Sequence, residues 1–190
     1  MSVSGSVKKG RLIIISAPSG CGKTTIVERL LERNKNLARS VSYTTRPPRP
    51  EEKNGTDYFF VSLGDFEDKL KKDFFWEHAT VFGESYGTSK TLVKQKVEKG
   101  KDCILAVDVQ GMKQLLESKS EIPIISIFVM PPSLEVLESR LRKRGTETES
   151  GVKKRLAVAK QEISESSLYD HVVVNKEVED AVRKIEDILK

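Results

Sequence analysis

The chain has 190 residues, with 33 lysines and arginines against 28 aspartates and glutamates, and so a formal net charge of +5. This length suits one large domain that carries inserted lobes. No apolar run of about 18 residues occurs, which excludes a membrane-spanning helix. The hydrophobic 37% is gathered in dense segments, which excludes wholesale disorder.

Composition also limits the compartment and the partners. The two cysteines, Cys21 and Cys103, are too few for a disulfide framework, and no secretory leader precedes the first apolar segment. We therefore expect a reducing, cytoplasmic location. The positive charge predicts anionic partners, but it does not choose among nucleotides, nucleic acids and acidic surfaces.

Apolar strands alternate with amphipathic helices along the chain. Buried strands are predicted for residues 11–16 (RLIIIS), 102–107 (DCILAV), 123–130 (PIISIFVM) and 171–175 (HVVVN). Helical spacing of apolar residues follows each strand, from residue 22 onward and over 111–117, 133–144 and 177–189. Such alternation predicts an α/β fold in three layers, a parallel sheet with helices on both faces.

Two regions interrupt this alternation. Residues 39–88 hold short β-like pieces (RSVSYTTR, DYFFV, FFWEHATVFG) and one helix, which begins with a capping-box pattern from Ser62 to Asp65. They predict an inserted mixed α/β lobe. Residues 142–155 (RKRGTETESGVKKR) are charged and punctuated by glycine, and they predict a lid or a hairpin of helices.

The segment APSGCGKT, residues 17–24, joins the first predicted strand to the first predicted helix. A GxxxxGK[ST] loop uses glycines to turn backbone N–H groups into one concavity, a lysine for terminal phosphates, and a hydroxyl for Mg²⁺. Ala17 replaces the first glycine, whereas Gly22, Lys23 and Thr24 occupy the required places. We predict a P-loop NTPase-type phosphate site, with Cys21 filling space, rather than a tight turn with a solvated lysine. The loop alone leaves ATPases, GTPases and kinases open.

A second anion site is predicted at SYTTRPPRP, residues 42–50, where Arg46 and Arg49 are three residues apart. Guanidinium groups give paired, charge-assisted hydrogen bonds to phosphate, and proline reduces the entropy lost in holding them. Taken alone, however, the segment is better explained as an exposed basic loop or a PxxP docking strip.

Further segments extend the pattern behind the phosphate loop. They are NGTDYFFV with Tyr58, FWEHA with Glu77, GESYGTS with Tyr86 and Thr88, VDVQG with Asp108, and RGTETES over 144–150. In this order they resemble the guanylate kinase family from about residue 11 to residue 189. The resemblance implies one domain over 1–190, with a core (10–37, 101–140 and 168–190), a GMP-binding lobe (38–90) and a lid (141–167).

The resemblance also implies transfer of the γ-phosphoryl group of ATP to GMP, and to dGMP, in purine nucleotide metabolism, with Mg²⁺ as the cofactor. The implied ATP-binding residues are Ala17, Pro18, Ser19, Gly20, Cys21, Gly22, Lys23, Thr24, Thr25 and, on the adenine side, Asn175. The implied GMP contacts are Arg46, Arg49, Tyr58 and Tyr86 for the phosphate, and Ser42, Glu77, Thr88 and Asp108 for guanine. The implied catalytic residues are Lys23, Arg46, Arg144 and Arg155, with Arg140 and Lys153 as further cations of the lid region. Thr24 and Asp108 are expected to hold the metal, directly or through water.

The chemistry of guanine agrees with the role of Glu77. Guanine presents N1–H and an exocyclic amine as neighbouring donors, which an acceptor-only carboxylate complements, whereas adenine would set an acceptor against that charge. Hydroxyls of Ser42 and Thr88 can donate to the O6 and N7 acceptors. Asp108, at the end of an apolar strand, also fits a Walker B position or a helix cap.

Three other functions stay open. They are a non-catalytic guanylate-kinase-like interaction module, a nucleic-acid binder that uses the basic clusters at 140–144 and 153–155, and a kinase for AMP, UMP or dTMP. Lys23, Arg46 and Arg49 argue against the first, while Glu147 and Glu149 interrupt the basic stripe that the second requires. We expect ATP and GMP as partners, and neither nucleic acid nor a membrane.

Overall fold

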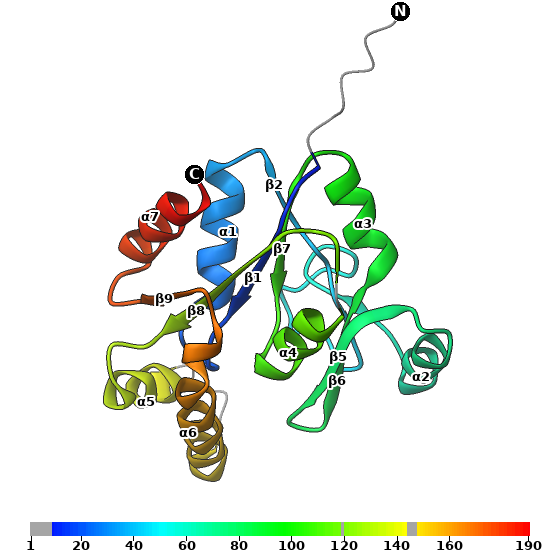
Figure 1. Ribbon diagram of the computed structural model, residues 1–190. Coiled ribbons are helices and arrows are strands. Elements are labelled where there is room, and N and C mark those ends of the chain that lie inside the picture. The colour runs from blue at the N-terminus through cyan, green and yellow to red at the C-terminus, as the bar shows by residue number, and fades with distance from the viewer. Residues whose placement is uncertain (1–8, 119, 144–147) are drawn as a thin grey trace, which may run out of the picture. The chain divides into compact units, whose positions relative to one another are not determined.

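The computed structural model describes residues 9–118, 120–143 and 148–190, and these residues form a five-stranded and a four-stranded sheet (Figure 1). The five-stranded sheet has the order β2-β7-β1-β8-β9, in which β2 pairs with β7 and β8 with β9 in parallel. The predicted α/β class with a parallel sheet is confirmed. Arg144 lies outside the described residues.

The five strands of this sheet lie close to the predicted runs. They are β1 (Leu12–Ser16), β2 (Leu37–Arg39), β7 (Asp102–Ala106), β8 (Ile124–Met130) and β9 (His171–Val174). All five residues of β1 are buried, as expected for an apolar inner strand of a parallel sheet. The predicted strands 102–107 and 171–175 end one residue early, so that Val107 and Asn175 fall just beyond their strands.

Helices follow these strands. They are α1 (Lys23–Arg33), α4 (Val109–Glu117), α5 (Leu134–Lys143), α6 (Glu149–Ser164), the short 3-10 turn η1 (Ser166–Leu168) and α7 (Val178–Leu189). On α7 the apolar face predicted from the spacing is buried at Val182, Ile185 and Leu189. Helix α6 starts at Glu149, with the Thr148 side chain accepting a hydrogen bond from the Gly151 N–H, so residues 149–155 are helical.

The four-stranded sheet has the order β4-β3-β6-β5, with β3 (Tyr43–Thr44), β4 (Phe59–Phe60), β5 (Phe75–Val81) and β6 (Glu84–Ser89). Helices α2 (Leu63–Lys71) and α3 (Lys90–Glu98) follow β4 and β6. The predicted cap of α2 is confirmed, because the Ser62 hydroxyl accepts the Asp65 N–H at 3.1 Å.

The predicted strand piece 74–83 is too long. Strand β5 ends at Val81 because Phe82 and Gly83 both have positive φ, 52° and 86°, and make the two-residue turn of a hairpin with β6. This hairpin pairs β5 with β6 antiparallel, and its register sets which side chains of the two strands stand opposite each other.

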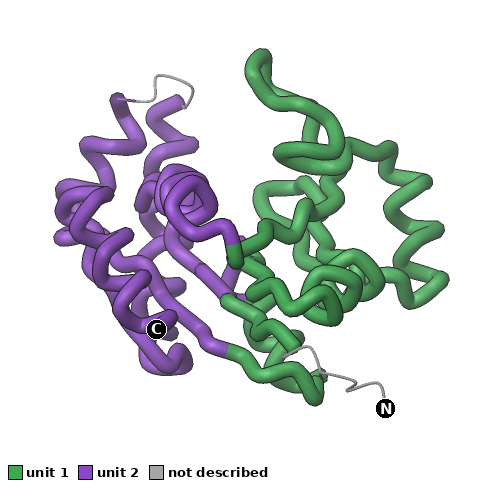
Figure 2. The backbone as a smooth tube through the Cα atoms, turned by 90° about the horizontal axis from the view of Figure 1, so that it is seen from above, with its two compact units in different colours: residues 1–13, 36–105, 110–124 green, residues 14–35, 106–109, 125–190 purple. Residues whose placement is uncertain are grey.

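The described residues separate into two compact units (Figure 2). Unit 1 comprises 1–13, 36–105 and 110–124, and unit 2 comprises 14–35, 106–109 and 125–190, as far as these ranges are described. The four-stranded sheet lies in unit 1, and the phosphate-loop segment lies in unit 2. The division into core, GMP-binding lobe and lid stays a prediction.

Candidate functional site: a phosphate loop and two polar clusters near the four-stranded sheet

In unit 2 the predicted phosphate loop connects β1 to α1. Gly20 and Gly22 have φ values of 93° and 82°, a left-handed conformation that side chains rarely adopt. Gly22 is the N-cap residue of α1, so helix α1 begins at Lys23 and has no acidic residue in its first turn. A helix N-terminus of this kind favours a bound anion.

Side chains of helix α5 pack closely against the loop at Gly20. A Cβ atom on Gly20 would lie 3.1 Å from side-chain carbons of Leu137 and of Leu141 on α5. Cys21 is fully buried, and burial raises the pKa of its thiol to about 12. The thiol is therefore protonated at neutral pH, which fits the prediction that Cys21 fills space.

Several polar groups of unit 2 lie around this loop. The Lys23 ammonium donates to the Val107 carbonyl at 3.0 Å, next to the half-buried Asp108. The Arg155 guanidinium donates to the Ser19 hydroxyl at 2.9 Å. Lys23, predicted for ATP, Asp108, predicted for guanine or the metal, and Arg155, predicted as a catalytic arginine of the lid, thus belong to the same unit as the loop.

Glu162, on α6, was not predicted from the sequence. Burial raises its pKa from the usual 4.5 to about 7, while Lys23 lowers it and Asp108 adds to the rise. Its sequence context, KQEIS, is that of an ordinary helical glutamate, so no local signal marked it.

The donors predicted for the metal suit Mg²⁺ in kind. Thr24 offers a hydroxyl and Asp108 a carboxylate, and Mg²⁺ prefers a few such oxygen ligands completed by substrate phosphates and water. Within residues 9–118, 120–143 and 148–190, no cluster of three or more His, Cys, Asp and Glu side chains is placed to hold a metal ion by itself. The nucleotide itself would have to supply part of the coordination.

In unit 1 the hairpin register brings the predicted guanine contacts together. Glu77 stands directly opposite Thr88, and the Thr88 hydroxyl donates to the Glu77 carboxylate at 2.5 Å. The Ser42 and Thr88 hydroxyl oxygens are 3.4 Å apart. Glu77 is 4% exposed, so its charge lies in a largely dry environment where a fixed partner matters most. Asp108, which was also predicted to contact guanine, belongs to unit 2 and is not part of this group.

The predicted phosphate contacts form a second cluster in unit 1. Tyr86 is two residues from Thr88 on β6, and its ring meets that of Tyr58 edge to face with centroids 6.0 Å apart. The Arg46 guanidinium lies over the Tyr58 ring at 5.5 Å from its centroid. Burial raises the pKa of Tyr58, so this phenol stays protonated at neutral pH and can donate a hydrogen bond.

Glu52 is the residue of this cluster that sequence reasoning missed. Both of its carboxylate oxygens accept hydrogen bonds from Arg46 Nη2 at 2.8 Å, and one also accepts the Arg49 backbone N–H at 2.8 Å. Arg46, which was predicted to contact the GMP phosphate, is thus held by an ion pair with Glu52. The Arg49 side chain is 63% exposed, with its guanidinium 4.0 Å from Glu52. The spacing of three residues between Arg46, Arg49 and Glu52 is the one feature of the sequence that could have indicated Glu52 as a partner of the arginines.

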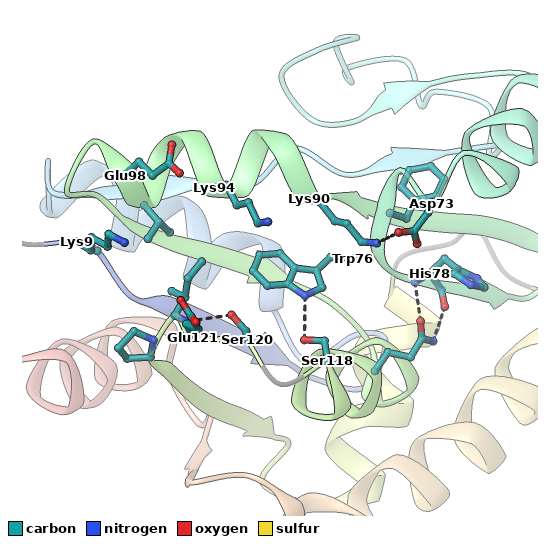
Figure 3. Close-up of a pocket in the computed structure, with 16 residues that line it drawn as sticks. Lys9, Asp73, Trp76, His78, Lys90, Lys94, Glu98, Ser118, Ser120 and Glu121 are labelled. Atoms are coloured by element: carbon teal, nitrogen blue, oxygen red, sulfur yellow. Dashed lines mark hydrogen bonds and ion pairs between the residues drawn. The ribbon is translucent and has the colours of Figure 1, made fainter.

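A cavity of about 780 Å³ in unit 1 contains none of these predicted contacts (Figure 3). Trp76 and His78, which flank Glu77 on β5, line it, and the Trp76 indole donates to the Ser118 hydroxyl at 2.9 Å. Because side chains alternate along a strand, these two residues face away from Glu77. The charges that line the cavity cancel, because three lysines face three acidic residues. They are Lys9, Lys90 and Lys94, and Asp73, Glu98 and Glu121.

A parallel sheet whose first strand enters a glycine-rich loop, with a lysine at the start of the following helix, defines a P-loop NTPase-type fold. Residues 9–190 match the family described as guanylate kinase. The chain belongs to the guanylate kinase family.

Individual relatives agree with this assignment. The chain is 46% identical over 182 residues to guanylate kinase of Maricaulis maris, covering 96% of this chain and 83% of the relative. It is 49% identical over 183 residues to guanylate kinase of Clostridium tetani, covering 96% and 86%. The crystal structure of guanylate kinase from Anaplasma phagocytophilum superposes with a TM-score of 0.78 at 36% identity, covering 96% of this chain and 85% of that one.

None of the helices in the described ranges is long and apolar enough to cross a membrane.

Proposed function

We propose that this protein transfers the γ-phosphoryl group of ATP to the phosphate of GMP or dGMP, giving ADP and GDP or dGDP. The observation that carries the proposal is the hydroxyl-bound carboxylate of Glu77 in the same unit as the ion pair of Arg46 and Glu52, in a chain that also has a phosphate loop. Membership of the guanylate kinase family supports the same activity, and nothing in the comparisons favours a non-catalytic interaction module.

In this reaction an oxygen of the GMP phosphate attacks Pγ of ATP. The new O–Pγ bond forms as the bond between Pγ and the bridging oxygen to Pβ breaks, and ADP leaves. No covalent intermediate on the protein is needed, because phosphoryl transfer is accelerated chiefly by positioning and by neutralising charge. We assign that neutralisation to Lys23, Arg46 and Arg155, with Arg144 as a further candidate.

Base selection falls to Glu77, Ser42 and Thr88. The Thr88 hydroxyl donates to Glu77 and fixes the orientation of the carboxylate, which as an acceptor complements guanine N1–H and the exocyclic amine. A base without these donors would leave a buried carboxylate unpaired, and that penalty can discriminate by about 10⁴-fold. Asp108 is kept as a candidate for guanine or for the metal.

Mg²⁺ is proposed as the cofactor, held by Thr24 and Asp108 together with the nucleotide phosphates. When bound, it would neutralise charge on the phosphate oxygens. The proposed setting is purine nucleotide metabolism in the cytoplasm, which agrees with Cys21 and Cys103 being free, buried thiols. Neither nucleic acid nor a membrane is a proposed partner.

The test is a direct assay of ATP-dependent conversion of GMP to GDP, with dGMP, AMP, UMP and dTMP measured side by side. We expect turnover with GMP and dGMP at specificity constants at least 10³-fold above those for the other monophosphates. Equal turnover of AMP would refute the assignment of Glu77. No turnover with any monophosphate, in a chain that still binds GMP, would favour the interaction module.

A further inference from the structure

A buried amide side chain contacts the phosphate loop from within unit 2. Asn175 follows strand β9, is 1% exposed, and its Nδ2 donates to the backbone carbonyl of Cys21 at 2.7 Å. A carbonyl oxygen can only accept, so the nitrogen of the amide must be the atom that faces it. This contact joins residues 154 positions apart in the chain.

The contact fixes the orientation of one peptide group of the loop. The described residues contain no cis peptide bond, and in a trans peptide the C=O and the following N–H point in opposite directions. Because the Cys21 carbonyl is directed at Asn175, the Gly22 N–H is directed away from it. That N–H belongs to the N-cap residue of α1, where the loop offers backbone donors to an anion.

Asn175 is itself held in place. Its backbone N–H donates to the Met130 carbonyl at 2.8 Å, and its own carbonyl accepts from Arg140 Nη2 at 3.2 Å. The fit is close, since a Cβ atom on Gly22 would lie 2.9 Å from Asn175 Nδ2. A side chain at position 22 would therefore collide with the amide unless one of them shifted.

We propose that Asn175 is a positioning residue for the phosphate loop, which aims the Gly22 N–H at the phosphates of the donor nucleotide. This role rests on the proposed function and replaces the adenine-side role expected from the sequence. The competing role is recognition of the base, because Asn175 Oδ1 is buried without a hydrogen-bond partner in the described part of the chain and an exocyclic amine could donate to it. In the first role a change at Asn175 weakens binding of the triphosphate, and in the second it weakens binding of the base.

The decisive variant is Asn175→Asp, which keeps the shape but sets an acceptor oxygen against the Cys21 carbonyl. Binding of ATP and of inorganic tripolyphosphate, which has no base, is measured by calorimetry, and initial rates are measured with ATP and with GTP as donors. We expect affinity for ATP and for tripolyphosphate to fall by a similar factor, about 10- to 100-fold. The ATP to GTP ratio of kcat/KM and the KM for GMP should not change.

The matched control is Lys176→Gln, which changes the charge by the same amount at the next, exposed residue and should bind both ligands like the wild type. Thermal unfolding is recorded for every variant. If Asn175→Asp does not fold, Asn175→Ala, which removes the donor without adding repulsion, is measured in the same assays and should lose the two affinities together.

Two results would overturn the positioning role while leaving the proposed function intact. One is weaker binding of ATP with unchanged binding of tripolyphosphate and a changed ATP to GTP ratio, which would assign Asn175 to the base. The other is a folded variant that binds both ligands like the wild type. A wild-type chain that binds neither ligand and makes no GDP would instead overturn the proposed function, and this role with it.

Discussion

Replacing Glu52 by glutamine tests how the acceptor site is built. Burial alone would raise the pKa of Glu52, but hydrogen bonds from the Arg49 backbone and from Arg46 outweigh it and hold the pKa below its usual value. The Arg46 and Glu52 side chains are 18% and 16% exposed, so this ion pair is only weakly screened by water. Glu52→Gln removes the charge and one of the two acceptors for Arg46 while keeping the shape of the side chain.

The expected cost follows from these contacts. A hydrogen bond to a charged group contributes about 1.5–3 kcal/mol, and glutamine retains one acceptor for Arg46. We therefore take a loss of about 2 kcal/mol in the positioning of Arg46, which corresponds to an approximately 30-fold rise in KM for GMP. The KM for ATP should stay within about twofold, because the loop that binds it is built from other residues.

The assay is steady-state turnover with GMP varied at saturating ATP, followed by ATP varied at saturating GMP. Glu51→Gln is the matched control, since it makes the same change in charge at the exposed neighbouring residue. A lower KM for GMP in Glu52→Gln would refute the reasoning, because Glu52 would then compete with the phosphate for Arg46. Equal effects of the two variants would show a general charge effect.

Three further outcomes are expected. Lys23→Ala should lower kcat by at least about 10²-fold with an unchanged thermal unfolding midpoint, and turnover like that of the wild type would remove the lysine from the phosphate site. Glu77→Gln should reduce the GMP to AMP ratio of specificity constants by about 10²-fold or more, and a constant ratio would place guanine recognition elsewhere. The pKa of Glu162 in the folded protein is about 7, against the usual 4.5, because burial disfavours the ionised carboxylate. The folded state therefore loses stability relative to the unfolded state as the pH rises from 4.5 through 7. In urea unfolding, Glu162→Gln should therefore gain stability relative to the wild type between pH 4.5 and pH 8, whereas a constant difference would contradict the raised pKa.

The local parts of the site could be predicted from the sequence. The strand before the phosphate loop, its two glycines and the helix that starts at Lys23 depend on neighbouring residues, and the structure has each of them. The cap at Ser62 was predictable for the same reason. Hydrophobic period and turn chemistry act over a few residues, so a single sequence contains them.

Contacts made across strands were not predictable in this way. The pairing of Glu77 with Thr88 depends on the register of the hairpin, which the turn at Phe82 and Gly83 sets. The predicted strand ran through that turn, and one residue of register would have moved every side chain of β5 to the other face. The resemblance to a family named both residues, but only the structure shows the hydrogen bond between them.

Supporting residues are the hardest to predict, because their sequence surroundings are ordinary. Glu52 follows another glutamate in a polar loop, and its role depends on a turn in which its N–H donates to the Arg49 carbonyl at 3.0 Å. Asn175 ends a strand like many polar residues, and its partner is distant in the chain. Composition and period carry no information about such contacts.

The same arrangement recurs at three of the groups that we assign to a nucleotide. Thr88 fixes the Glu77 carboxylate, Glu52 fixes the Arg46 guanidinium, and Asn175 fixes a peptide of the phosphate loop. Donors and acceptors that are already oriented need not reorganise when charge develops between two phosphates, which is the main way in which proteins accelerate phosphoryl transfer. Substitution of a supporting residue should therefore lower affinity or turnover for the nucleotide on its own side, even though the supporting residue need not touch that nucleotide.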